Sequence, residues 1–287
     1  MESILEAHRQ YPENKASLAG KQSGTFPYKS TLAIPGLSGK YGLQLDWNGK
    51  VVPSCVHCHQ INDAVRDTYH KKGEAIPDEW IYPWPQPETL GLSLTPDRAA
   101  TLASVTPGSW AARAGLQPGD TLLTAAGQLL ASSADLSWVL HRMAESGPLT
   151  VEYTREGQRK QTDLQLPNGW RRHSDIGRRV GTWQLRGIAS GGLFLEDLDD
   201  AARRTRGLAP DRMALLVKHA GEYGQHAAAK KAGFRKEDIL VEVEGASARK
   251  SEGQVLGELL RTKKRGDLIR AKVLRDSQTL ELAWPMQ

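Results

Sequence analysis

The pattern of apolar and polar positions follows the same order in two parts of this chain. Each copy opens on a small-residue segment that ends in Ala-Gly, followed by an acidic turn and a strand-like run (AGLQPGDTLL from Ala114, AGFRKEDIL from Ala232). A helix-like stretch and two alternating strand-like stretches come next in both copies. The helical apolar positions are Leu136, Val139, Leu140 and Met143 in the first copy and Val255, Leu256, Leu259 and Leu260 in the second. The repeat therefore predicts an α+β chain with two similar domains, each with strands and helices in the same order.

The N-terminal part carries weaker patterns. An amphipathic stretch over residues 2–11 ends at Pro12 and predicts the residual helix of an absent upstream domain. Asn48-Gly49 predicts a tight hairpin turn. The strands that this irregular module is expected to hold lie at residues 31–34, 42–46 and 50–52.

A second helix is predicted over residues 60–72, with Ile61, Ala64, Val65, Thr68 and Tyr69 on one face and Gly73 at its end. Residues 76–91 then hold four prolines and two tryptophans, so we expect an ordered connector that is neither helix nor central strand. The expected domain organisation begins with a residual helix (1–12) and a small module (13–88) that holds a Cys-x-x-Cys-His (CxxCH) motif and the proline-rich connector. A first repeat (89–167), a connector (168–190) and a second repeat (191–287) follow.

Composition changes this picture little. An apolar share of 39% and a charged share of 25% are typical of a globular protein, and a net charge of +5 among 38 basic and 33 acidic residues describes a solvated surface. We expect no membrane span, because no apolar run is long enough, and the start of the chain lacks the features of a secretory signal.

Two tryptophans among the arginines of residues 167–192 are interpreted as a wedge between domains, with no nucleic-acid partner. Catalytic proteolysis is disfavoured, since the one candidate serine, Ser190, lies where the second repeat begins.

Residues 104–127 and 218–245 resemble the PDZ domain in the form common in bacterial periplasmic proteases and their relatives. The resemblance implies that an extended peptide adds as a strand between a sheet edge and a helix, with its carboxylate at a Φ-G-Φ loop. For the first repeat it implies a peptide site at Leu90, Gly91, Leu92, Leu94, Leu136, Val139 and Leu140. For the second it implies one at Gly192, Leu193 and Phe194, although an insert of charged residues follows before a strand at 214–217. The alternative is that the same apolar residues only fill the two cores.

The two cysteines of the chain lie in a C-x-x-C-H pattern at Cys55, Cys58 and His59. This spacing is typical of covalent attachment of haem c, with His59 as an axial ligand of the iron and His70 as a candidate second ligand. A thiol–disulfide redox pair at Cys55 and Cys58 is the main alternative. Another metal, for which only three ligands are present, and inert buried thiols are further alternatives.

Several longer segments together resemble the thioredoxin-like/PDZ (seleno)protein group of planctomycetes and related bacteria. They are CVHCHQINDAVRDTY, YPWPQPETLGLSL, DLSWVLHRM, LPNGWRRHSDIGRRVGTW and VKHAGEYGQHAAAKKAGF. The resemblance implies an extracytoplasmic location and a thioredoxin-like domain that is absent from this chain.

From these patterns we expect a non-catalytic extracytoplasmic scaffold that binds peptide or protein segments and carries haem c or a redox centre. Two alternatives are a thiol–disulfide redox component that docks its substrate through PDZ domains and a plain interaction module with structural cysteines. The oligomeric state is not predicted.

Overall fold

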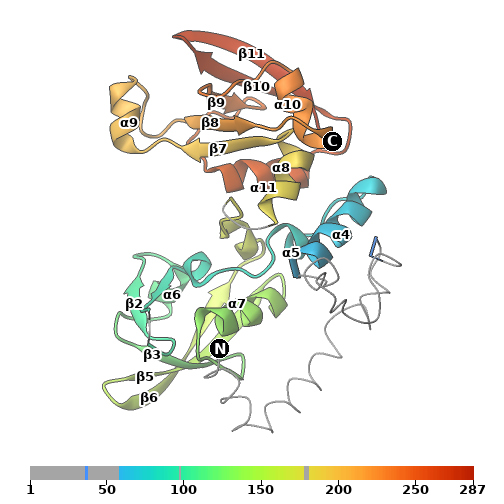
Figure 1. Ribbon diagram of the computed structural model, residues 1–287. Helices are drawn as coiled ribbons and strands as arrows, with labels where there is room; N and C mark the ends of the chain where they lie inside the picture. The colour runs from blue at the N-terminus through green and yellow to red at the C-terminus, as the bar shows by residue number, and fades with distance from the viewer. Residues whose placement is uncertain (1–35, 38–57, 97, 178–180) are drawn as a thin grey trace, which may run out of the picture. The chain divides into compact units, whose positions relative to one another are not determined.

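The computed structural model describes residues 36–37, 58–96, 98–177 and 181–287 (Figure 1). Its internal contacts divide the chain into two compact units, Met1–Thr68 and Tyr69–Gln287. The predictions for residues 1–35 and 38–57, including the first helix, the three strands, the Asn48-Gly49 turn and Cys55, lie outside the described residues.

Helix α4 occupies Cys58–Lys71, two residues earlier at its start than the periodicity indicates. The predicted stop is confirmed, because Gly73 adopts a left-handed conformation (φ 70°) and its amide donates to the His70 carbonyl. The buried positions include Val65, as expected, but also Arg66 and His70, so its polar side chains are covered as well. Within the described ranges, no helix has the length and apolar character needed to cross a membrane.

The proline-rich segment contains two single helical turns, which corrects the prediction that it holds no helix. Helix α5 (Asp78–Ile81) follows Pro77, and the 3-10 helix η2 (Pro87–Leu90) begins at Pro87. Proline has no amide to lose at the start of a helix, so both positions tolerate it. The turn of α5 buries Trp80 and Ile81, which anchor the connector.

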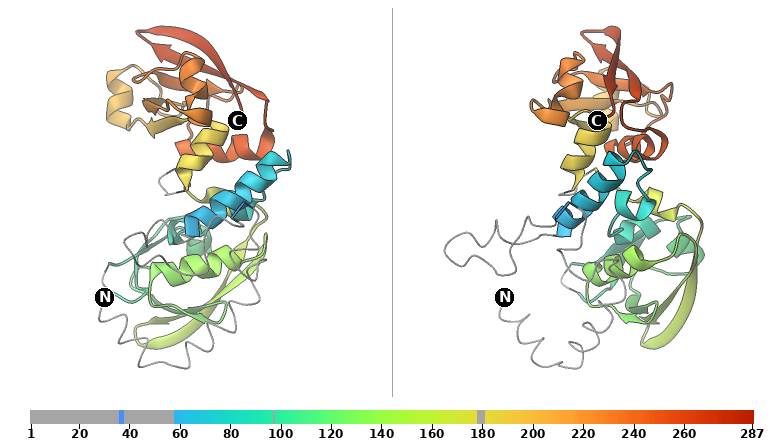
Figure 2. Two further views of the ribbon diagram at one scale, coloured as in Figure 1. Left: turned by 45° about the vertical axis from the view of Figure 1, so that its right-hand side comes forward. Right: turned by 90° about the vertical axis from the view of Figure 1, so that its right-hand side faces the viewer.

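The first repeat contains a two-stranded and a four-stranded antiparallel sheet, in the orders β1-β2 and β4-β3-β5-β6. The helix α7 lies beside the long hairpin of β5 and β6 (Figure 2). One hydrophobic core joins both sheets, α7 and the indole of Trp170. The elements are β1 (Leu92–Leu94), β2 (Leu102–Val105), α6 (Trp110–Arg113), β3 (Thr121–Ala125), β4 (Gln128–Leu129), α7 (Ser133–Arg142), β5 (Gly147–Arg155), β6 (Gln158–Leu166) and the 3-10 helix η3 (Trp170–His173).

The second repeat joins its strands into one five-stranded antiparallel sheet, β11-β10-β9-β8-β7. Helices α8 and α11 both contact β7 and each other (Figure 1). The elements are α8 (Thr182–Ala189), β7 (Leu193–Asp197), α9 (Asp200–Thr205), β8 (Leu215–Ala220), η4 (Gly224–Ala227), α10 (Ala228–Lys231), β9 (Ile239–Val243), α11 (Glu252–Thr262), β10 (Leu268–Arg275) and β11 (Gln278–Pro285).

The tryptophans of the connector at 168–190 do not act as one wedge. Trp170 is fully buried in the first repeat, where its indole N–H donates to the Ala144 carbonyl. Trp183 is 49% exposed and stacks on His226 of the second repeat, with 4.1 Å between ring centroids. Each ring therefore belongs to a different repeat, which corrects the interpretation of a shared wedge.

A buried carboxylate fixes the turn before the central strand of the first repeat. Asp120 is 1% exposed, and its Oδ2 accepts the amide of Gln117 at 2.8 Å. Arg155, the last residue of β5, donates to both carboxylate oxygens at 2.7 and 2.8 Å and to the Gly115 carbonyl. These hydrogen bonds raise the pKa of the Arg155 guanidinium above its ordinary value. The pair of Asp120 and Arg155 thus connects three parts of the first repeat: the Ala-Gly segment after α6, the turn before β3, and the hairpin of β5 and β6.

The second repeat has the same arrangement with different neighbours in sequence. Asp238 is 1% exposed and accepts the amide of Arg235 at 2.8 Å. Arg275, the last residue of β10, donates to both oxygens of Asp238 at 2.6 and 2.7 Å and to the Gly233 carbonyl. The sequence repeat at Asp120 and Asp238 is therefore also a repeat of one three-dimensional contact.

The charged insert of the second repeat is held by a buried arginine. The guanidinium of Arg203 on α9 donates to the carbonyls of Leu198, Ala209 and Arg212 and to the carboxylate of Asp197. Its side chain is 1% exposed. The insert therefore forms a closed loop between β7 and β8, and β8 continues the sheet after it.

We predict that Asp120→Ala lowers the free energy of unfolding of the first repeat by about 2–3 kcal/mol, because a buried amide and a guanidinium lose their acceptor. Hydrogen exchange should rise in residues 102–125 and 147–166 and stay unchanged in residues 215–285. Asp238→Ala should have the reverse distribution. The exposed Asp163→Ala is the control and should stay within about 0.5 kcal/mol of the parent protein; an equal effect of Asp120→Ala and Asp163→Ala would contradict the assignment.

Candidate functional site

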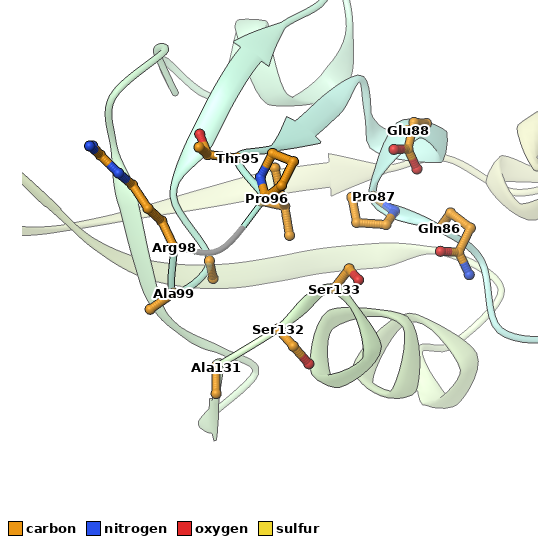
Figure 3. Close-up of a pocket in the computed structure, with 12 residues that line it drawn as sticks. Gln86, Pro87, Glu88, Thr95, Pro96, Arg98, Ala99, Ala131, Ser132 and Ser133 are labelled. Atoms are coloured by element: carbon orange, nitrogen blue, oxygen red, sulfur yellow. The ribbon is translucent and has the colours of Figure 1, made fainter. Parts of the chain in front are cut away.

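The first repeat has a cleft between the edge strand β1 and the first turn of α7. Its volume is about 490 Å³. Figure 3 shows Glu88 at one end of the cleft, Arg98 at the other, and Ser133 at the start of the helix. The lining residues are Gln86, Pro87, Glu88, Leu94, Thr95, Pro96, Arg98, Ala99, Ala100, Ala131, Ser132 and Ser133. Among the described strands, β1 pairs with β2 alone, so its other edge faces this cleft.

The hydrogen bonds around β1 show which backbone groups point toward the open edge. The Gly91 carbonyl accepts the amide of Thr106, and the Thr95 amide donates to the Thr101 carbonyl. Successive residues of an antiparallel strand direct their amides and carbonyls to alternate edges. Leu92 and Leu94 therefore direct their amides and carbonyls away from β2, which is where an added strand would bond.

Gly91 is required by the geometry of the loop before β1. Its φ of 84° is left-handed, and a Cβ there would lie 2.2 Å from Cβ of Ser109. Its amide already donates to the Glu88 carbonyl at 3.0 Å. Gly91 therefore shapes the loop, and a side chain placed here would disrupt the loop itself.

The structure places the predicted groove residues of the first repeat in two groups. Leu90, Leu92, Leu136, Val139 and Leu140 are at most 3% exposed and form part of the hydrophobic core. Leu94 packs against that core as a partly buried residue and also lines the cleft. The apolar periodicity thus found the core that supports the cleft, and of these leucines and Val139 only Leu94 lines it.

The polar residues of the cleft were missed by the sequence reasoning. Ser132 is the N-cap of α7 and forms a capping box with Asp135. The Ser-Ser-Ala-Asp pattern before the helical apolar run is the signal that could have located this end of the helix. Arg98 and Glu88 are surface charges without a pattern, so only the fold brings them to one cleft.

The second repeat has a cleft in the corresponding place, between β7 and the first turn of α11, with a volume of about 540 Å³. Of the predicted residues, Gly192 (φ 91°) leaves no room for a Cβ, which would lie 2.0 Å from the His226 carbonyl oxygen. Leu193 is buried in the core. Phe194 is 38% exposed and lies under the guanidinium of Arg186, 4.5 Å from the ring centroid. Phe194 thus lines the cleft, whereas Leu193 supports it.

The C-terminal end of α7 is fixed by a buried arginine. Arg171, 1% exposed, donates to the carbonyls of Leu140, His141 and Met143. Carbonyls of the last helical turn lack partners within the helix, and a cation there also interacts favourably with the helix dipole. Burial lowers the pKa of Arg171 from its ordinary value. These contacts provide donors for carbonyls at the end of the helix, where Met143 is the C-cap.

His141 connects α7 to the tryptophan-rich connector. Its ring stacks on Trp84 with 4.3 Å between centroids and meets Trp80 edge-on at 6.4 Å. Its Nδ1 lies 3.5 Å from the Trp84 amide nitrogen, which donates to it. Burial, together with the nearby charges of Arg171 and Arg142, lowers the pKa of His141 to about 4. The imidazole is therefore neutral at physiological pH.

The CxxCH motif is only partly described. Cys58 and His59 are the first residues of α4, and Cys55 lies outside the described residues. His70 is buried near the other end of the same helix. Over the described ranges, no group of His, Cys, Asp and Glu side chains has the arrangement of a metal site.

Ser190, the one candidate nucleophile, has a structural role. It is 1% exposed, and its Oγ lies 3.1 Å from the carbonyl oxygens of both Arg186 and Leu193. Its hydroxyl thereby closes the turn between α8 and β7.

Residues 89–166 match the family model of the PDZ domain, which confirms the predicted PDZ domain in this part of the chain. Among solved structures, a similar chain is "HtrA-type protease AlgW with decapeptide", at 15% identity and a TM-score of 0.32, covering 55% of this chain and 44% of that one. A second is "HtrA-type protease AlgWS227A with decapeptide", at 14% identity and a TM-score of 0.33, covering 65% and 54%. The matched region spans about half the length of those chains. A search of curated proteins gives no match.

We predict that His141 makes the stability of the protein depend on pH between about 6.5 and 4. The pKa of His141 is about 4 in the folded protein and 6.5 ordinarily, so the unfolded chain binds a proton first. The free energy of unfolding should therefore fall as the pH decreases through this window, by up to about 3 kcal/mol.

Urea unfolding at stepped pH measures this dependence. His141→Gln should flatten it relative to the parent protein, whereas His219→Gln, at an exposed position, should leave it unchanged. A parent-like slope in His141→Gln would show that other groups carry the dependence.

Proposed function

We propose that the first repeat binds an extended peptide segment, which adds as a strand to the open edge of β1 against the first turn of α7. The observation that carries the proposal is the open edge of β1 in a PDZ domain, where Leu94 directs its backbone groups away from β2 and lines a cleft of about 490 Å³. Addition of a strand to such an edge is the recognition mode of PDZ domains. The main-chain bonds supply affinity and the cleft supplies side-chain preference.

The chain as a whole is, in this proposal, a non-catalytic scaffold. The second repeat is a second PDZ-like domain, supported by the matched strand registers and by the shared contact of Asp120 and Asp238. The resemblance to the thioredoxin-like/PDZ group supports an extracytoplasmic location.

Leu94→Pro tests the added strand directly. Proline removes the amide that faces the cleft but none that bonds to β2, and edge strands tolerate it. Leu94→Ala is the matched control, because it removes the same side chain and keeps the amide. Capture of peptides with a free C-terminus from a display library, followed by fluorescence anisotropy on a selected peptide, measures the effect.

We expect Leu94→Pro to bind at least about tenfold more weakly than Leu94→Ala, the value of one hydrogen bond. Circular dichroism checks that both variants are folded. Equal affinity of the two variants would rule out strand addition at β1.

A second candidate function is a redox or haem centre at CxxCH. It is supported by α4, which begins at Cys58 and carries His59 in its first turn. Two thioethers to Cys55 and Cys58 would attach haem c, and His59 would be one axial ligand. As a dithiol, the same cysteines would form and break a disulfide, and the helix start would lower the pKa of a thiol there.

Expression with cytochrome-maturation machinery separates these two chemistries. Haem attachment predicts a Soret band and a positive pyridine haemochrome assay that are both lost in Cys55→Ser/Cys58→Ser. A colourless protein with one disulfide that dithiothreitol reduces would reject haem and favour the thiol pair.

A further inference from the structure

The clefts of the two repeats correspond residue by residue at the strand edge. In the first repeat Leu92 pairs with Val105 and Leu94 with Leu102, and the register shifts between Ser93 and Leu94. In the second repeat Leu193 pairs with Ala220 and Leu195 with Val217, with the same shift between Phe194 and Leu195. Leu195 is therefore the counterpart of Leu94, and its amide faces the cleft.

The helices that face these edges also correspond at their first residues. Ser132 and Ser251 are the N-caps of α7 and α11, and each helix begins with a capping box. The residue after the N-cap is Ser133 in the first repeat and Glu252 in the second, and both line their clefts. The same position beside the strand edge thus carries a short hydroxyl in one repeat and a long carboxylate in the other.

Glu252 reaches across the second cleft to the strand. Its Oε1 accepts the amide of Leu195 at 2.8 Å, and the residue is 5% exposed. Arg186 holds the carboxylate with two hydrogen bonds of 2.8 and 2.6 Å. Nη2 of Arg186, which donates to Oε2 of Glu252, also donates to the Gly177 carbonyl at 2.8 Å. The carboxylate is thereby fixed in one orientation against the edge of β7.

The first cleft has no such group in the described part of the chain. Ser133 has no hydrogen bond to Leu94, and the chain before η2 provides no arginine counterpart of Arg186, because Pro85 stands at the same distance before Gly91 as Arg186 before Gly192. The amide of Leu94 therefore faces open space where that of Leu195 has an acceptor.

We infer that Glu252 closes the second groove to peptide, so that the residue after the N-cap decides which groove of the pair binds a strand. The inference rests on the proposed function of the first repeat. An added strand bonds to the edge amides through its backbone carbonyls, and Oε1 of Glu252 occupies the place of one such carbonyl at Leu195. A peptide that enters the second groove must displace a buried ion pair, whose side chains are 13% and 6% exposed.

Amide exchange in the free protein tests the closure without any ligand. By NMR, the Leu195 amide should exchange at least about tenfold more slowly than the Leu94 amide. Glu252→Ser should remove this difference, and Glu252→Gln, which keeps an oxygen at Oε1, should retain most of it. Equal exchange of Leu94 and Leu195 in the parent protein would overturn the inference.

Peptide capture tests the consequence in a background where the first groove is blocked. Leu94→Pro/Glu252→Ser should capture peptides with a free C-terminus from the display library, and Leu94→Pro/Glu252→Gln should not. If the serine variant does not fold, Glu252→Asp replaces it in this experiment. The aspartate side chain is too short to reach the Leu195 amide, but it still places a negative charge beside Arg186. Folded variants without capture, while the parent protein does capture, would overturn the inference. Absence of capture by the parent protein would instead reject the proposed function, and amide exchange at Leu195 would then still decide the closure.

Discussion

The ion pair between a buried aspartate and a partly exposed arginine is the contact on which both repeats depend. Asp120 and Asp238 each lie at the turn into a central strand, and each accepts a backbone amide and a bidentate arginine. Leu102 and Val217 donate their amides to the carbonyls of these same aspartates. The strand that pairs with the cleft edge is therefore connected through a single residue to the C-terminal hairpin. A carboxylate buried to this degree must be paired, so the contact also excludes alternative registers of the turn.

The two repeats share the contact between aspartate and arginine, yet the side chains beside their clefts differ. An edge strand with the same register shift and a helix with a capping box occur in both repeats, and the side chains beside the strand edge differ. Ser133 leaves the amide of Leu94 open, whereas Glu252 and Arg186 fill the corresponding space. An exposed strand edge alone is therefore not sufficient for peptide binding. The residues in the first turn of the facing helix determine whether a peptide can pair with that edge.

Much of the fold could be predicted from periodicity, because apolar residues report which face of an element is buried. The paired C-terminal hairpins follow from such patterns, whereas the PDZ domain is inferred from the resemblance of residues 104–127 to that family. The pairing of Asp120 with Arg155 could not, since charged residues are frequent and only the strand register selects the partner. The same holds for Glu252, which appears in sequence as an ordinary acidic residue in the first turn of a helix. The apolar groove residues were predicted from the correct elements, but Leu136, Val139 and Leu140 support the cleft from the core and do not line it.

The carboxylate at the edge of β7 also bears on how the five-stranded sheet avoids other copies of itself. A strand at the end of a sheet is a template for strands of a second chain, and proteins protect such edges with charged side chains. Here β7 ends one side of a sheet whose other side is β11. Glu252 and Arg186 cover part of that edge with charge, and the insert held by Arg203 begins directly after it. The contact between Glu252 and Leu195 therefore places an ion pair at the edge where a strand of a second chain would have to pair.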